Sequence, residues 1–259
     1  PLLNMPGRTS SANSLAARFA HTIAISYENT AEYVRSKNSS EKIIRTGIPV
    51  RSRLLKPSTA DPYVQLRIPA RGPLLLVLGG SQGAERINDL IIASLDELLP
   101  AYTVLHQTGQ QHTEVVTQTA QALIKQKEHL DKYYARGFLD VDTLAAALRA
   151  AALVISRAGS GSIYEIALHG KPSILIPIPE EISHDQRLNA YAYARVGAAS
   201  VMEEENLTPH LLTAEIARIM NDHALQLKMS EAARAFAPVD AAEKIADILI
   251  SIGLSHERY

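Results

Sequence analysis

The sequence predicts an α/β fold with a doubly wound, parallel, Rossmann-like sheet. Short runs such as residues 74–78 and 153–156 are apolar throughout, which is typical of strands buried on both faces of a parallel sheet. Amphipathic stretches of helical length separate these runs, and glycines or small polar residues follow several of them. Because crossovers between parallel strands are right-handed, such alternation winds into a sheet covered by helices on both faces.

Each element of this domain is predicted by a change between strand-like and helix-like periodicity. The run at residues 74–78 is the first strand, and the stretch after its glycines has the 3.6-residue period of a helix. The same alternation continues to about residue 236. We expect strands at residues 74–78, 103–106, 133–138, 153–156, 173–178 and 200–202, and helices at 84–99, 113–129, 142–150, 160–169, 184–196, 209–221 and 224–236.

Different segments flank the main domain, which we place at residues 73–238. Residues 1–47 read as a separate unit, with short strands at 22–26 and 43–44 and helices at 14–20 and 30–36. Residues 48–72 contain several prolines and little periodicity, which predicts an irregular interdomain linker. Residues 239–259 contain a last helix, at 240–252, whose apolar face carries Ile245, Ile248, Leu249 and Ile252.

The composition excludes several classes of function. Of the 259 residues, 46% are hydrophobic and 20% are charged, which is typical of a globular protein with a core. The net charge of -1 provides no overall attraction to nucleic acid. Cysteine is absent, which excludes disulfides, thiolate catalysis and cysteine-ligated zinc. The first residue is Pro1, and we expect the chain to begin inside a longer protein.

A glycine-rich loop follows the first strand of the main domain. Gly79, Gly80, Ser81, Gln82 and Gly83 lie between a buried strand and a helix, where backbone approaches a ligand closely and free N–H groups face it. The loop is not G-x-G-x-x-G, no acid ends the next strand as an NAD ribose would need, and no G-K-[ST] follows. A phosphate or sugar-nucleotide contact and a plain tight turn both remain open.

A second cluster of small residues follows the fourth strand, at residues 156–162. Ser160 and Ser162 can cap the next helix or donate to an anion, and Glu165 lies one turn further along. The carboxylate of Glu165 could accept two ribose hydroxyls, or it could simply complement the helix dipole. The sequence leaves both readings of Glu165 open.

A third polar cluster follows the fifth strand. Gln186 and Asn189 are one turn apart on one helix face, and amides suit sugar hydroxyls because they donate and accept. The alternative is a solvated helix start, with Asp185 in the first turn. Because all three clusters follow strands, we expect them at the carboxyl edge of one sheet, where open α/β sheets bind ligands.

Other polar residues carry less information. His106 is on the same edge, where a lone histidine is more often structural, and Arg51 could reach a phosphate or be a solvated linker residue. The nine histidines show no H-E-x-x-H spacing, and no G-x-S-x-G elbow is present. We therefore expect neither a metal site nor a serine hydrolase.

Taken in order, these motifs resemble the MurG family of bacterial N-acetylglucosaminyl transferases. The resemblance runs from about residue 14 to the C-terminus. Its specificity comes from the order and spacing of several motifs, which lie at residues 46–51, 79–84, 106–109, 137–140, 156–159 with Glu165, 170–172, and 185–186 with Asn189.

The resemblance implies a role for each matching residue. The diphosphate of a UDP-sugar would be bound by Arg51 and Ser81 and by the helix start at Ser160, Gly161 and Ser162. Uracil would contact Phe138 and the backbone of Leu139, the ribose would contact Glu165, and the sugar would contact Asp185, Gln186 and Asn189. Two positions depart from the family, since Asp185 replaces an amide or imidazole and Ile48 replaces an asparagine.

The resemblance also implies an activity. The family performs inverting transfer of N-acetylglucosamine from UDP-N-acetylglucosamine to a lipid-linked muramyl pentapeptide during peptidoglycan synthesis, without a cofactor. It acts as a peripheral protein at the cytoplasmic face of the bacterial plasma membrane. Residues 1–47 would be the end of the N-terminal acceptor domain. The catalytic base would lie upstream, so we expect this chain to bind donor without transferring sugar.

Three other functions stay open at this point. The chain could belong to a glycosyltransferase of the same architecture with another lipid acceptor, such as a diacylglycerol. It could be a non-catalytic donor-binding subunit that needs a partner, or a purely structural interaction domain. A purely structural domain should have no affinity for nucleotides, and replacing Glu165 with alanine would then change nothing.

Overall fold

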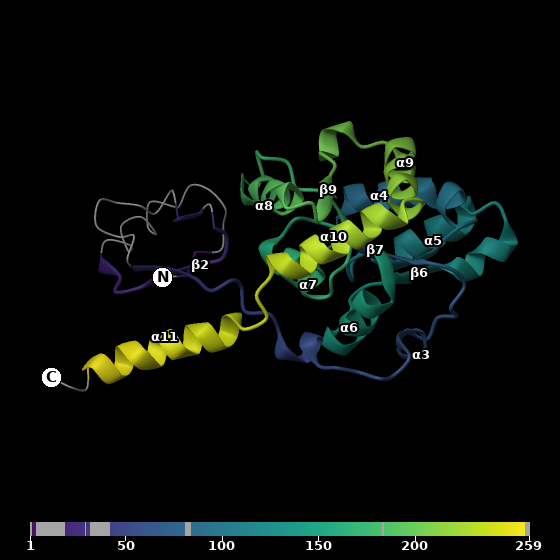
Figure 1. The fold of residues 1–259 in the computed structure, drawn as a ribbon. Coiled ribbons are helices and arrows are strands. Elements are labelled where there is room, and N and C mark those ends of the chain that lie inside the picture. Colours follow the sequence, from purple (N-terminus) through teal and green to yellow (C-terminus); the bar gives the residue numbers. More distant parts are fainter. Residues whose placement is uncertain are drawn as a thin grey trace.

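The larger domain is a parallel sheet between two layers of helices, as the sequence predicts (Figure 1). In this computed structural model of the chain, residues 2–3, 19–28, 30–31, 42–80, 84–182 and 184–256 are described. The expected helices at 14–20 and 30–36 fall largely outside these ranges.

Six parallel strands form the main sheet, in the order β6-β5-β4-β7-β8-β9. The chain starts at the central strand β4, moves outward through β5 and β6, and returns beside β4 as β7 before moving outward on the other side. Ligands bind where the strand order reverses, which here lies between β4 and β7. The strands are β4 (Leu74–Leu78), β5 (Thr103–Gln107), β6 (Tyr133–Arg136), β7 (Ala151–Ser156), β8 (Ser173–Leu175) and β9 (Ala199–Val201).

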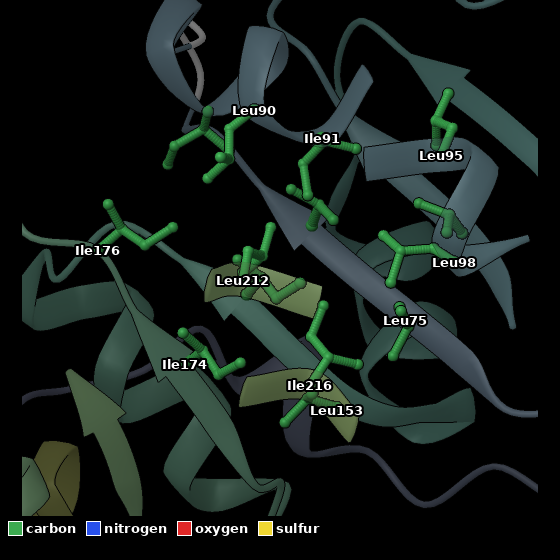
Figure 2. Close-up of a cluster of buried hydrophobic side chains, with 14 of the residues drawn as sticks. Leu75, Leu90, Ile91, Leu95, Leu98, Leu153, Ile174, Ile176, Leu212 and Ile216 are labelled. Atoms are coloured by element: carbon green, nitrogen blue, oxygen red, sulfur yellow. The ribbon is translucent and has the colours of Figure 1, made fainter. Parts of the chain in front are cut away.

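The central strand β4 is buried on both faces, which explains its uniformly apolar sequence. Leu75 and Val77 belong to one core cluster, whereas Leu74, Leu76 and Leu78 belong to the cluster on the opposite face. Figure 2 shows the first cluster, in which Leu75 shares a core with side chains of helices that cover this face. Each leucine buried in this way contributes roughly 1.5–3 kcal/mol.

Three helices of the domain begin at residues whose side chains cap them. Asp140, Thr208 and Asp222 each accept hydrogen bonds from first-turn N–H groups of the helix that follows. The α-helices are α4 (Glu85–Leu98), α5 (Thr113–Leu123), α6 (Val141–Ala150), α7 (Ser160–Leu168), α8 (His184–Arg195), α9 (Pro209–Met220) and α10 (His223–Phe236). Two 3-10 helices, η3 (Lys127–Lys132) and η4 (Glu204–Asn206), lie between them.

Helix α5 and strand β8 fall furthest short of their expected lengths, and β6 also ends two residues early, at Arg136. Helix α5 ends at Leu123, because Ile124 turns to an extended conformation and is buried. Strand β8 ends at Leu175 instead of continuing to residue 178. Pro177 and Pro179 have no N–H group to donate to a ladder, and this accounts for the early end of the strand.

The linker is more ordered than expected, and the prediction of an irregular connection was wrong in this respect. It contains η2 (Ser52–Leu55) and α3 (Pro62–Leu66). Asp61 caps α3 by accepting a hydrogen bond from the Tyr63 N–H, and Pro62 occupies the first helical position, where no N–H is needed. Leu54 and Leu66 are buried in the core cluster shared with β4 and α6.

A smaller parallel sheet precedes the linker. It has the order β1-β2-β3, with strands β1 (Leu2–Leu3), β2 (Ile23–Ile25) and β3 (Ile43–Arg45). The last helix, α11 (Ala241–His256), leaves the larger domain and returns to this sheet (Figure 1). Ile245, Ile248, Leu249 and Ile252 of α11 line an apolar groove of about 350 Å³ together with the segment around β2.

Candidate functional site

The three sequence clusters meet at the carboxyl edge of the main sheet, on either side of the strand-order reversal. The loop after β4 is tied to β5, because the Gly79 N–H donates to the Gln107 carbonyl at 3.1 Å. Gly80 has φ +86°, a left-handed conformation that favours glycine, and no described atom lies within 4 Å of a Cβ placed there. Ser81, Gln82 and Gly83 lie outside the described residues, so the diphosphate contact expected of Ser81 stays a prediction.

The start of α7 is accessible at this edge. Its N-cap is Gly159, which has no side chain to satisfy the first-turn N–H groups. Gly161 is exposed, and within the described part of the chain no atom lies within 4 Å of a Cβ at this position. Ser160 and Ser162 flank it and are partly exposed. The free N–H groups and the positive end of the helix dipole therefore suit an anion.

Glu165 and Arg51 are brought together by the fold. The Arg51 Nη2 donates to Glu165 Oε1 at 2.7 Å, linking the interdomain linker to the second turn of α7. The Glu165 side chain is 17% exposed and that of Arg51 is 47% exposed. The carboxylate predicted to bind a ribose and the guanidinium predicted to bind a diphosphate are thus partners in the ligand-free protein.

The amides of α8 hold the loop that precedes α7. Gln186 Oε1 accepts from the N–H groups of Ala158, at 3.2 Å, and Ile178, at 3.3 Å. Asn189 is buried, and its Nδ2 donates to the Ala158 carbonyl at 3.2 Å. Asn189 Oδ1 has no hydrogen-bond partner among the described residues. The Nε2 group of Gln186 is the part of that side chain left to donate to a ligand.

Two predicted uracil contacts lie at the end of β6. Phe138 is half exposed, whereas Leu139 is buried. The Leu139 N–H donates to Gln107 Oε1 at 3.3 Å, so its carbonyl is the backbone group that remains for a ligand. Asp140 caps α6, and the backbone hydrogen bond from Thr143 is the main cause that lowers the pKa of its carboxyl group.

The buried histidine of β5 is structural. His106 is fully buried in β5, burial lowers its pKa to about 3, and its Nδ1 lies 2.9 Å from the Tyr133 hydroxyl. The neutral ring therefore supports the sheet, in agreement with the structural reading of this residue. His169 follows α7, and burial is the main cause that lowers its pKa.

Arg157 is a residue of this edge to which the sequence analysis assigned no role. Its side chain is 14% exposed, and its Nη1 donates to the carbonyls of Ile176 and Pro177 and pairs with Glu204 Oε2 at 2.5 Å. The signal available in the sequence was a single arginine among small residues directly after a buried strand.

Two cavities lined by described residues lie away from this edge. One of about 370 Å³ lies between Tyr27, Arg45 and Phe236, and the groove on α11 is the other. No group of His, Asp or Glu side chains within the described ranges is arranged to hold a metal ion. Among the helices that the structure describes, none is long and apolar enough to span a membrane.

The fold and the site define a class of protein, namely the Rossmann-like donor domain of GT-B-type glycosyltransferases. Residues 74–245 match the model of the glycosyltransferase family 28 C-terminal domain, and the chain belongs to this family. The match covers the whole main sheet, together with α7 and α8.

Similar proteins agree with this family. The chain is 31% identical over 251 residues to the UDP-N-acetylglucosamine--N-acetylmuramyl-(pentapeptide) pyrophosphoryl-undecaprenol N-acetylglucosamine transferase of Acetivibrio thermocellus, covering 95% of the chain and 64% of that relative. The chain therefore spans somewhat less than two thirds of this relative's length.

Solved structures share the fold. The crystal structure of Acinetobacter baumannii MurG superposes with a TM-score of 0.72 at 24% identity, covering 96% of the chain and 65% of that structure. UDP-GlcNAc 2-epimerase from Neisseria meningitidis, solved bound to UDP-GlcNAc, has a TM-score of 0.69 at 14% identity, covering 96% and 68%. At these identities the likeness concerns the fold alone.

Proposed function

We propose that the chain binds the nucleotide diphosphate of UDP-N-acetylglucosamine at the carboxyl edge of the main sheet. The observation that carries the proposal is the uncapped start of α7, which lies beside the strand-order reversal with the Arg51–Glu165 pair one turn away. The helix start suits the diphosphate, Glu165 suits two ribose hydroxyls, and Gln186 Nε2 suits a sugar oxygen. Phe138 and the Leu139 carbonyl are assigned to uracil.

The proposed reaction is an inverting transfer of N-acetylglucosamine. An acceptor hydroxyl attacks the anomeric carbon, the bond to the diphosphate oxygen breaks, and UDP leaves. Negative charge grows on the diphosphate during this step. The positive end of α7 and the guanidinium of Arg51 stabilise that charge without a metal ion. None of the residues assigned here is the base that removes the acceptor's proton.

The acceptor that we propose is the lipid-linked muramyl pentapeptide of peptidoglycan synthesis. The name of the Acetivibrio thermocellus relative supports this acceptor, although the chain spans only part of that protein. Acting on such a lipid places the protein at the cytoplasmic face of the bacterial plasma membrane as a peripheral protein. A role in cell wall growth, cell shape and division follows from the same proposal.

Isothermal titration of the chain with UDP, UDP-N-acetylglucosamine and NADH tests the proposed donor. We expect both uridine nucleotides to bind and NADH not to bind. Glu165→Ala should weaken UDP binding about a hundredfold or more, because two hydrogen bonds to a charged group are lost, each contributing about 1.5–3 kcal/mol. Binding of NADH without binding of UDP, or an unchanged affinity in the Glu165→Ala variant, would contradict the assignment.

The role given to α7 and Arg51 predicts that metal ions are dispensable for binding. The UDP affinity should be the same in EDTA as in magnesium, because protein groups supply the positive charge. The same titration in the two buffers measures this. A large gain in affinity on adding magnesium would assign the charge neutralisation to a cation instead.

A further inference from the structure

Arg157 links the ends of several neighbouring strands. Its backbone N–H donates to the Leu78 carbonyl of β4 at 3.4 Å. Its Nη1 reaches the carbonyls of Ile176 and Pro177, at 3.2 and 3.3 Å, just past the end of β8. The same nitrogen pairs with Glu204 of η4, beyond β9. A single residue of the β7 loop therefore contacts three other segments of the ligand-binding edge.

Arg157 continues the connection between β7 and β8 where their backbone ladder stops. The ladder ends after the Ile176 N–H donates to the Ser156 carbonyl at 2.9 Å. Pro177 and Pro179 cannot donate, so the only N–H between them belongs to Ile178, and it goes to Gln186. The carbonyl groups of Ile176 and Pro177 accept hydrogen bonds from Arg157.

These contacts form a closed circuit around Gln186. Arg157 holds residues 176 and 177, Ile178 donates to Gln186 Oε1, and that same oxygen accepts from Ala158, the neighbour of Arg157. With two N–H donors on its oxygen, the amide of Gln186 has one orientation, and its Nε2 faces away from both loops. Displacing residues 176–178 would remove one of the two donors that fix it.

The ion pair between Arg157 and Glu204 is mostly buried, and burying two charges costs free energy of folding. The side chains of Arg157 and Glu204 are 14% and 15% exposed, and the Arg157 Nε has no hydrogen-bond partner in the described part of the chain. A mostly buried ion pair is seldom a net gain for stability, because desolvation offsets the attraction. Its place, at the end of the strands that carry the site, points to a role in organising the site.

We propose that Arg157 is a positioning residue for recognition of the donor sugar. It clamps residues 176–178 so that the Gln186 amide is fixed with its nitrogen toward the sugar, while the diphosphate contacts at α7 depend on it less. The proposal rests on the proposed function, since it assumes a sugar nucleotide in this site. It concerns selectivity for the sugar and involves no contact between Arg157 and the ligand.

The test compares the affinities of the chain for UDP and for UDP-N-acetylglucosamine in the native protein, Arg157→Gln and Arg157→Lys. In Arg157→Gln we expect UDP-N-acetylglucosamine to bind about tenfold more weakly, as for one lost hydrogen bond to the sugar, while UDP affinity changes by less than about threefold. Arg157→Lys keeps one cationic donor at this place and should show a smaller loss. Arg218→Gln, which breaks an exposed pair with Glu215, should leave both affinities unchanged.

The outcomes distinguish a positioning role of Arg157 from a merely structural one. Equal weakening of both ligands in Arg157→Gln would show a merely structural role and overturn the proposal, as would an unchanged ratio of the two affinities. If Arg157→Gln does not fold, Arg157→Lys carries the test, and an unchanged ratio there overturns the proposal. Failure of the native chain to bind either nucleotide would instead reject the proposed function.

A second measurement needs no ligand. Hydrogen exchange of the Ile178 and Ala158 amides should become faster in Arg157→Gln than in Arg218→Gln, because the clamp on their segment is lost. Unchanged exchange at both amides would contradict the clamp itself, whatever the chain binds.

Discussion

The pairing of Arg51 with Glu165 has a larger consequence for binding than for stability. The Arg51 side chain is about half exposed, and exposed ion pairs contribute roughly 0–1 kcal/mol to folding. A charge-assisted hydrogen bond from the same guanidinium to a phosphate contributes more, about 1.5–3 kcal/mol. The two magnitudes favour a ligand as the main reason for an arginine at this position.

The variant Arg51→Met should therefore separate affinity from stability. We expect its UDP affinity to fall about tenfold or more, while its free energy of unfolding stays within about 1 kcal/mol of the native value. Titration calorimetry and urea unfolding measure the two effects. The matched control is Arg53→Met, since Arg53 is also in the linker and pairs with an exposed acid, Asp142. A loss of stability without a loss of affinity would identify Arg51 as a structural residue.

Gln186→Glu tests whether the amide nitrogen binds the sugar. A glutamate keeps an oxygen that can accept from the Ala158 and Ile178 N–H groups, but it replaces the Nε2 donor with a second acceptor. We expect the melting temperature to change little and the affinity for UDP-N-acetylglucosamine to fall about tenfold. If the amide served the loops alone, the affinity of this variant would equal that of the native chain.

The sequence predicts the candidate residues of the site better than their contacts. Glycines, a carboxylate and amides after three strands are visible as residue types at fixed spacing, and the fold brings their strands to one edge. The burial of Asn189 and the pairing of Arg51 with Glu165 depend on segments far apart in the chain. Local periodicity does not contain that information, and the contacts of Arg157 likewise became visible only in the structure.

At the scale of the element, β5 contains a buried histidine whose protonation opposes folding. Burial lowers the pKa of His106 from 6.5 to about 3, so between these values the unfolded chain binds more protons than the folded one. Its contribution to stability is fully present above pH 6.5 and is lost as the pH falls toward 3. Acid should therefore destabilise this strand.

The variant His106→Gln should reduce that pH dependence. Between pH 6.5 and 4.5, we expect the native chain to lose up to about 1.4 kcal/mol per pH unit more than the variant. Urea unfolding at several pH values measures the difference, and carboxylates that titrate in both proteins cancel. Parallel curves for the two proteins would show that folding does not lower the pKa of His106.

The lengths of elements were less predictable than their existence. Every strand and helix expected between residues 73 and 238 is present, because apolar runs and amphipathic periods are local signals. The isoleucines at residues 174–178 predicted a longer strand. Two prolines, Pro177 and Pro179, lie in this segment, and β8 ends before them. In the linker, Asp61 followed by Pro62 is a signal for a helix start. The many prolines of the segment predicted an irregular connection instead.

At the scale of the whole molecule, the chain passes between the smaller sheet and the larger domain twice, and the two passages lie side by side. Gly47 precedes the linker and Pro238 precedes α11, and a Cβ on Gly47 would lie 2.5 Å from the Pro238 Cγ. Tyr27, Tyr164 and Phe236 pack edge to face or tilted around this crossing, and the Tyr164 hydroxyl donates to the Ser26 carbonyl at 2.6 Å. The packing of these aromatic rings holds the smaller sheet and the larger domain together.

Gly47→Ala should lower the stability of the protein by more than the strain in its backbone conformation alone explains. Gly47 and Gly197 have nearly equal φ angles, +82° and +86°, so an alanine at either position costs about 1–2 kcal/mol of strain. No described atom lies within 4 Å of a Cβ on Gly197, whereas at Gly47 the new methyl group meets Pro238 and the Tyr164 ring. We expect Gly47→Ala to be the less stable protein in urea unfolding, with α11 cleaved faster by protease than in Gly197→Ala. Because the two variants share the backbone penalty, equal stability and equal cleavage would show that the crossing does not couple α11 to the larger domain.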